Sequence, residues 1–110
     1  MRKFKTLFLD DALEFLELLD EKTSDKIIYN IDKAEQGNDP KLFKKLTDNI
    51  WEFRTKYGNL QYRLLAFWDK RDKEEILVIS AHGIVKKTDK VPPKEIAKAE
   101  NLMKQYFDNQ

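Results

Sequence analysis

Three strand-like runs lie close together in the middle of the chain, within residues 50–87. They cover residues 50–54, 62–68 and 75–85. Gly58-Asn59 separates the first two runs, and the charged residues 69–74 separate the last two, so both junctions carry turn chemistry. Because short connections join antiparallel neighbours, this spacing predicts an antiparallel meander.

The first run alternates between aromatic and charged side chains. Trp51 and Phe53 occupy one set of positions, and Glu52 and Arg54 occupy the other. Successive side chains of a strand point to opposite faces, so we expect the aromatic residues in the core and the charges on the other face. Arg63, near the start of the second run, comes within cross-strand reach of the charged pair. One face of the sheet is therefore predicted to display several cations with a carboxylate among them.

These charged residues have two interpretations. In the first, Glu52 pairs with Arg54 or Arg63 as a surface ion pair, which contributes about 0–1 kcal/mol to stability. In the second, the guanidinium groups form a cradle for a phosphodiester. Arginine contacts phosphate oxygens bidentately, and a buried cation stabilises the charge that grows in a transition state. The spacing alone favours the ion pair.

The residues before the meander predict a strand, two helices and a loop. Residues 2–9 alternate partly and are expected to form a strand, and Asp10 is expected to cap a helix with a wide leucine stripe. A second helix is expected from a cap at Thr23 or Ser24 to about Gln36. Two consecutive helices with a short break make a helical hairpin that packs on the sheet.

The remaining segments complete one α+β domain. Residues 38–40 mark a loop, and residues 41–46 are expected to contain a short helical turn. Pro92-Pro93 is expected to start a C-terminal helix, because proline is tolerated in the first turn. The order is thus β-α-α-β-β-β-α: an antiparallel sheet with a helical hairpin and a C-terminal helix packed on it, in a single domain over residues 1–110.

Composition excludes several classes of protein. The chain has no cysteine, so disulfides and cysteine-based zinc sites are absent and a reducing cytoplasm is expected. With a single histidine and no glycine-rich phosphate loop, neither a metal nor a cofactor is expected. No apolar run approaches the ~18 residues of a membrane span. The formal net charge is only +1, so a nucleic-acid binder would have to concentrate its cations locally.

The basic residues around the meander are candidates for contacts with RNA. Lys86 and Lys87 follow the last run, where they form either a solvated basic loop, which composition favours, or a patch for the RNA backbone. The affinity of such a patch would fall steeply with salt concentration. The candidate RNA contacts as a set are Lys45, Lys56, Tyr62, His82 and Lys86.

Histidine and aromatic residues have a structural interpretation beside the functional one. His82 precedes a glycine inside an apolar run, where a structural role is favoured over that of a general base. Tyr62 lies beside an arginine, so it is placed to stack on a splayed base. Trp51 and Trp68 are expected in the core rather than as platforms on which bases stack.

Four segments together resemble a known protein family. They cover residues 50–54, 62–65, 81–88 and 92–99, which read IWEFR, YRLL, AHGIVKKT and PPKEIAKA. As a set they are similar to the signature of the phage-derived Gp49-like proteins, a group close to HigB within the RelE/ParE toxin superfamily. The resemblance spans almost the whole chain, including its length and the order of its elements.

This resemblance implies a cytoplasmic toxin of a type II toxin–antitoxin system. Relatives of the RelE and HigB kind enter the ribosomal A site and cleave mRNA without a metal, through the 2′-OH, leaving a 2′,3′-cyclic phosphate. The family's basic positions fall on Arg54 and Arg63, and after the last strand on Lys86 or Lys87, of which Lys87 is taken as catalytic. Glu52 stands where some relatives carry a basic residue, and it acts either as the base for the 2′-OH or as a group that orients an arginine.

The resemblance also implies partners and alternatives. The expected partners are a cognate antitoxin, a helix-turn-helix protein of the HigA kind, and the ribosome with its mRNA; no membrane is involved. Many relatives carry a tyrosine or histidine just after the last strand, where this chain has Thr88-Asp89-Lys90, so the general base is not identified. The alternatives are a ParE-like toxin that inhibits DNA gyrase and an inactive prophage remnant.

Overall fold

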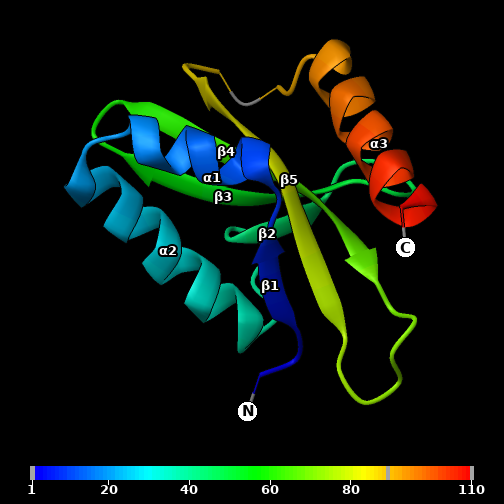
Figure 1. Ribbon diagram of the computed structural model, residues 1–110. Helices are drawn as coiled ribbons and strands as arrows, with labels where there is room; N and C mark the ends of the chain where they lie inside the picture. The colour runs from blue at the N-terminus through cyan, green and yellow to red at the C-terminus, as the bar shows by residue number, and fades with distance from the viewer. Residues whose placement is uncertain (1, 89, 110) are drawn as a thin grey trace.

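The computed structural model of the protein describes residues 2–88 and 90–109, whose arrangement is shown in Figure 1. The elements are β1 (Lys5–Phe8), α1 (Asp10–Leu18), α2 (Glu21–Glu35), β2 (Phe43–Lys45), β3 (Trp51–Tyr57), β4 (Leu60–Asp69), β5 (Leu77–Lys86) and α3 (Pro93–Asp108). The predicted α+β class, with a helical hairpin before the meander and a helix near the C-terminus, is confirmed.

Strands β3, β4 and β5 form the predicted antiparallel meander. β3 pairs with β4 from Trp51 opposite Ala66 to Tyr57 opposite Leu60. The turn between these strands contains Gly58, whose φ of 63° lies in the left-handed region that glycine adopts without steric cost. β4 pairs in turn with β5 over almost its whole length. The turn that the sequence predicted at Gly58-Asn59 therefore lies between β3 and β4, as expected.

The complete sheet has five strands in the order β1-β5-β4-β3-β2. β1 lies parallel to β5, from Lys5 opposite Leu77 to Phe8 opposite Ser80. The expectation of a wholly antiparallel sheet is therefore wrong for this one pair. The partner of β1 lies far along the chain, and the local pattern of residues 2–9 contains no signal for its direction.

The short strand β2 replaces the helical turn that was expected over residues 41–46. Phe43 lies opposite Phe53 of β3, and Lys45 lies opposite Trp51. The ring of Phe43 stacks on that of Phe53 at a centroid distance of 4.5 Å and on that of Trp51 at 4.9 Å. Burial of this aromatic ring against β3 explains why the segment is extended, since the helical alternative offers it no such contact.

Both helices of the hairpin begin at positions other than those expected. The N-cap of α1 is Leu9, so Asp10 lies in the first turn, where a negative charge favours the helix dipole. The N-cap of α2 is Asp20, whose carboxylate accepts a hydrogen bond of 2.8 Å from the backbone N–H of Thr23. The predicted cap at Thr23 or Ser24 is therefore wrong, because an earlier aspartate supplies the acceptor.

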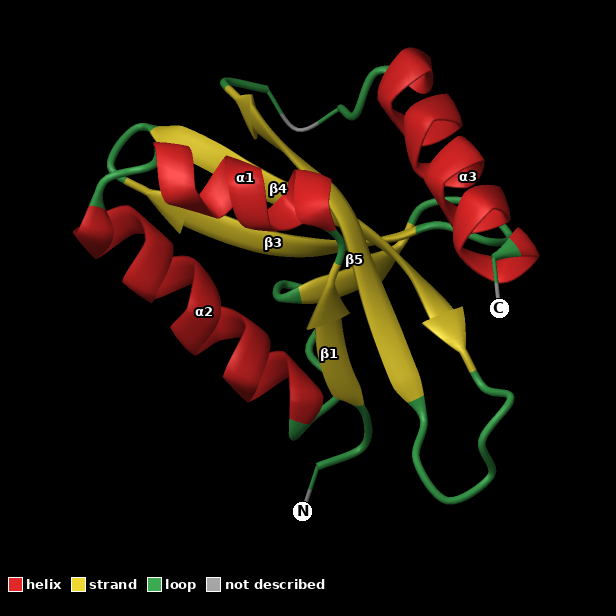
Figure 2. Ribbon diagram, viewed as in Figure 1, coloured by secondary structure: helices red, strands yellow, loops and turns green. Residues whose placement is uncertain are grey.

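Helices cover both faces of the sheet, as Figure 2 shows for α1 and α2 on one side and α3 on the other. One core cluster joins Ala12 of α1 and Ile27 of α2 to alternate residues of the strands, including Leu64. The second core cluster joins Ala99 of α3 to the strand residues that point to the other face of the sheet, including Leu65. None of the helices in the described part of the chain combines the length and apolarity needed to cross a bilayer.

Helix α1 lies directly against β5 at one glycine. A Cβ at Gly83 would clash with the ring of Phe15 in α1. A residue without a Cβ is therefore required for α1 to pack this closely. α1 and α2 thus pack on one face of the sheet, and α3 packs on the other.

Candidate functional site

The predicted charged residues of the meander lie on the face of the sheet that α3 partly covers. Arg54 of β3 and Arg63 of β4 are directly opposite one another in the antiparallel register. Glu52 lies two residues before Arg54, and hence on the same face. The sequence-based expectation that these three side chains share a face therefore agrees with the structure.

Glu52 lies between the two guanidinium groups. Its Oε1 is 3.0 Å from Nε of Arg63, and its Oε2 is 3.5 Å from Nε of Arg54. The side chains of Arg63 and Glu52 are only 2% and 3% exposed, whereas that of Arg54 is 25% exposed. This is not the exposed surface pair that spacing favoured, because one buried carboxylate holds two arginines.

Two lysines add positive charge near this carboxylate. Lys86, the last residue of β5, is buried opposite Gln61, and Lys44 of β2 lies opposite Glu52. Burial raises the pKa of Glu52, and the positive charges of Arg63, Arg54, Lys86 and Lys44 offset that effect only in part. We call Glu52, Arg54, Arg63 and Lys86 the Glu52 cluster. It sets three formal positive charges against one carboxylate, so an anion is attracted to it.

An open hollow of about 380 Å³ adjoins the cluster. Its lining residues are Lys41, Arg54, Thr55, Lys56, Gln61 and Arg63. Gln61 accepts a hydrogen bond from Nη2 of Arg63, and Nη1 of Arg54 donates to the backbone carbonyl of Pro40 at 3.3 Å. Arg54 is thus the member of the cluster that combines a fixed position with contact to solvent.

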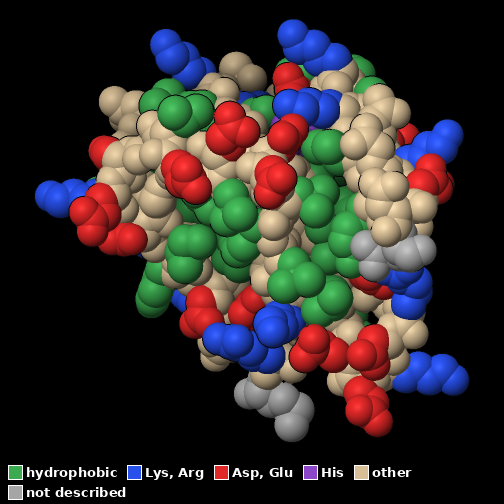
Figure 3. All heavy atoms as spheres, viewed as in Figure 1, with side chains coloured by type: hydrophobic (Ala, Val, Ile, Leu, Met, Phe, Trp, Pro, Cys, Tyr) green, Lys and Arg blue, Asp and Glu red, His purple; other side chains and the backbone are tan. Residues whose placement is uncertain are grey.

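The acidic residues of the chain are concentrated elsewhere. Figure 3 shows acidic side chains gathered over α1 and α2, which cover the opposite face of the sheet. The sequence indicated this separation, because residues 10–35 contain much of the acid. A net charge of +1 is therefore compatible with a locally positive face.

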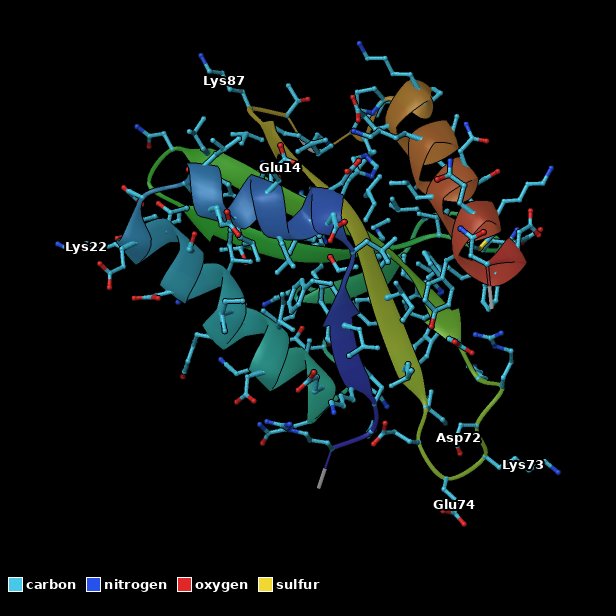
Figure 4. The ribbon with its side chains drawn as sticks, viewed as in Figure 1. Glu14, Lys22, Asp72, Lys73, Glu74 and Lys87 are labelled. Carbon is cyan, nitrogen blue, oxygen red and sulfur yellow. The ribbon has the colours of Figure 1, made fainter. Side chains whose placement is uncertain are left out.

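Five predicted residues lie outside the cluster, and His82, the last of them, is described below. Lys87 is exposed and extends from the end of β5 into solvent in Figure 4, so it does not face the arginines. Tyr62 is buried in the core under α1 and α2, so the prediction that its ring stacks on a base is wrong. Lys45 lies opposite Trp51 rather than Glu52, at the edge of the sheet. Lys56, another predicted RNA contact, lines the hollow beside the cluster.

His82 connects the sheet to α3. Its Nε2 lies 3.2 Å from Oε1 of Glu95 in α3, and the imidazole is buried. Burial lowers the pKa of His82, the hydrogen bond to Glu95 raises it in part, and the charge of Lys98 lowers it further. Asp11 of α1 also faces it and raises the pKa. This geometry agrees with the structural role that the sequence favoured.

A pH-dependent stability follows from this histidine. A lowered pKa means that the unfolded chain binds the proton more readily, so the contribution of neutral His82 is present above about pH 6.5 and is lost as the pH falls. Relative to His82→Gln, the wild-type protein should lose unfolding free energy between about pH 7.5 and 5.5, by at most about 1.4 kcal/mol per unit. Urea denaturation of both proteins across that range measures the difference, and a difference that does not change with pH would contradict it.

Sequence reasoning missed three polar residues around the cluster: Lys41, Lys44 and Gln61. Gln61 shares the parity of Arg63 on β4, so the period of two was a usable signal for it. Lys44 and Lys41 had no such signal, because β2 was not recognised as a strand. Among residues 2–88 and 90–109, no three histidine or acidic side chains are grouped so that they could hold a metal ion.

Comparison with protein families gives one match. Residues 14–104 match the family described as Phage derived protein Gp49-like (DUF891), which spans every member of the Glu52 cluster. A search among curated proteins gave no match to this chain. The match covers most of the chain and confirms the family that the four sequence segments resemble. The chain therefore belongs to the Gp49-like family, a phage-derived group of toxin-like proteins.

Proposed function

We propose that the protein is the toxin of a type II toxin–antitoxin system and cleaves mRNA on the ribosome. One observation carries the proposal: a single buried carboxylate holds Arg54 and Arg63 side by side next to an open hollow. Guanidinium groups in such an arrangement match the oxygens of a phosphodiester. Because the cluster has more positive than negative charge, it stabilises an anion whose charge grows during the reaction.

The reaction that fits this cluster is an internal transfer within the RNA. The 2′-oxygen attacks the adjacent phosphorus and loses its proton, while the bond from phosphorus to the 5′-oxygen breaks and that oxygen gains a proton. The products are a 2′,3′-cyclic phosphate and a 5′-hydroxyl. In the proposal Arg54 contacts the scissile phosphate, and the buried Arg63 beside it adds to the positive potential at that phosphate. Glu52 acts as a positioning residue, because both of its oxygens face guanidinium groups.

The proposal includes two macromolecular partners. The ribosome presents the mRNA, and a cognate helix-turn-helix antitoxin of the HigA kind neutralises the toxin in the cytoplasm of its host. The basic face described above would meet the RNA, whereas the acidic face over α1 and α2 repels it. The antitoxin is expected to be co-encoded, since the host could not otherwise tolerate the activity.

Induced expression followed by primer extension on a translated mRNA tests this function. We expect growth to stop and new 5′ ends to appear within the coding region, in register with codons. The same mRNA without its start codon is the control and should stay intact. DNA breaks without RNA cuts would instead identify a gyrase inhibitor of the ParE kind. Unchanged growth despite expression of the folded protein would identify an inactive prophage remnant.

A further inference from the structure

The two tryptophans of the chain lie together on the inner strands β3 and β4, where Trp68 packs against the core as expected. Trp51 begins β3 and Trp68 lies near the end of β4, with ring centroids 5.6 Å apart and an interplanar angle of 84°. Both rings are only half-buried, and both line the same two hollows. We call this pair and the residues around it the tryptophan site.

The hollow on one side of the pair is aromatic. It has a volume of about 370 Å³, and Phe4 and Phe43 contribute to its walls. The Phe43 ring stacks on Trp51 at 4.9 Å, and the Phe4 ring meets Trp68 edge-on at 5.2 Å. Lys3 and Asp39 also line it, and the Asp39 carboxylate already accepts a hydrogen bond from the backbone N–H of Lys41.

The hollow on the other side is lined by more positive than negative charge. It measures about 540 Å³ and is lined by Lys45, Lys70, Asp48 and Asn49, with Met103 and Phe107 of α3. Nζ of Lys70 lies 4.7 Å from the centroid of the Trp68 ring. Aromatic faces with lysines beside them are the combination with which proteins bind single-stranded nucleic acid, because bases stack on the rings and phosphates pair with the cations.

Strand β2 connects this site to the Glu52 cluster. Its neighbouring residues Lys44 and Lys45 lie opposite Glu52 and Trp51, so one faces the cluster and the other faces the tryptophan site. Trp51 and Arg54 are three residues apart on β3, so their side chains point to opposite faces of the sheet. β2 is the edge strand on this side of the sheet, and its lysines Lys44 and Lys45 are exposed on the two faces. An RNA bound at the cluster therefore reaches the tryptophans by passing around the edge that β2 forms.

We propose that the tryptophan site binds an unpaired nucleotide of the same RNA, beyond the edge strand β2 from the bond that is cleaved. Its base stacks on Trp51 or Trp68, and its phosphates contact Lys45 and Lys70. The inference rests on the proposed function for its substrate class, RNA, and adds a second subsite with tolerance for any base, since every base has a face that can stack. The predicted RNA contact Lys45 acts here rather than at the cluster.

Tryptophan fluorescence tests this proposal directly, because both tryptophans of the chain belong to the site. Titration of the full chain with a short single-stranded oligoadenylate should quench the fluorescence to saturation. The double variant Lys45→Gln/Lys70→Gln, which changes only exposed side chains, should weaken binding about tenfold or more. Trp68→Leu should weaken it as well, read from the remaining Trp51. Lys22→Gln, on the far helical hairpin, is the matched control and should bind as the wild type does.

Three results would overturn the proposal. They are the absence of quenching, equal binding by the lysine double variant and the wild type, and quenching by an apolar peptide but not by RNA. Cleavage of ribosome-bound mRNA, measured in parallel, separates this inference from the proposed function. Cleavage without quenching rejects RNA binding at the tryptophan site and supports the proposed nuclease activity. Saturable quenching without cleavage supports the site and rejects the nuclease.

Discussion

Replacing Arg63 with methionine should lower the free energy of unfolding by about 3–5 kcal/mol. The Arg63 side chain is 2% exposed, and its Nε lies 3.0 Å from a carboxylate that is itself buried. Methionine fills similar space but leaves Glu52 with less positive charge to offset the cost of its burial. Chemical denaturation of wild-type and variant protein at about pH 7.5 measures the loss.

The loss in Arg63→Met should depend on pH in a defined direction. Burial already raises the pKa of Glu52, and Arg63 is the largest opposing influence, so the variant raises that pKa further. A raised pKa in the folded state gives stability that is present at low pH and lost as the pH rises through that value. The deficit should therefore shrink between about pH 7.5 and 5, and Glu52→Gln/Arg63→Met should recover most of it. A loss of unfolding free energy that does not change with pH, or a double variant as unstable as Arg63→Met, would contradict a buried ion pair between Glu52 and Arg63.

Replacing Arg54 with alanine should lower the rate of RNA cleavage by about 10²–10³-fold. Arg54 is the cluster arginine with appreciable exposure, 25%, and it lines the hollow, so we place it in contact with the scissile phosphate. Its removal should change the free energy of unfolding by no more than about 1 kcal/mol, since the ion pair is partly solvated. Loss of Arg54 should thus lower mainly the cleavage rate, whereas loss of Arg63 should lower mainly the free energy of unfolding.

Two further variants control this result. Arg54→Lys keeps the charge but loses the planar fork, so an intermediate loss of rate is expected. Lys22→Ala removes one positive charge from the first turn of α2, far from the hollow, and should leave the rate unchanged. Equal losses in Arg54→Ala and Lys22→Ala would show that overall charge matters, rather than a phosphate contact at the cluster.

The sequence predicted the elements that depend on local patterns. Alternation in β3 placed Glu52 and Arg54 on one face, and the turn at Gly58 brought Arg63 opposite Arg54. These inferences need only the period of two and a tight turn, both of which act over a few residues. The family was likewise recognisable from short segments that keep their order along the chain.

The remaining features depend on contacts between distant segments. β2 is a strand because Phe43 packs on β3, and the parallel pairing of β1 depends on β5. The burial of Arg63 was not predictable either, because a strand pattern gives the face of a side chain but not what covers it. The same holds for the partial exposure of Trp51 and Trp68, since the sequence placed both in the core and not beside two hollows.

The most direct test of the account is the cleavage of mRNA on purified ribosomes by wild-type protein and Arg54→Ala. The account predicts that the wild type cuts the mRNA and leaves 2′,3′-cyclic phosphate ends. Arg54→Ala should cut about 10²–10³ times more slowly while unfolding at nearly the same denaturant concentration. Equal cleavage rates for the two proteins, or mRNA that stays intact with folded wild-type protein present, would contradict the claim that the Glu52 cluster binds the scissile phosphate.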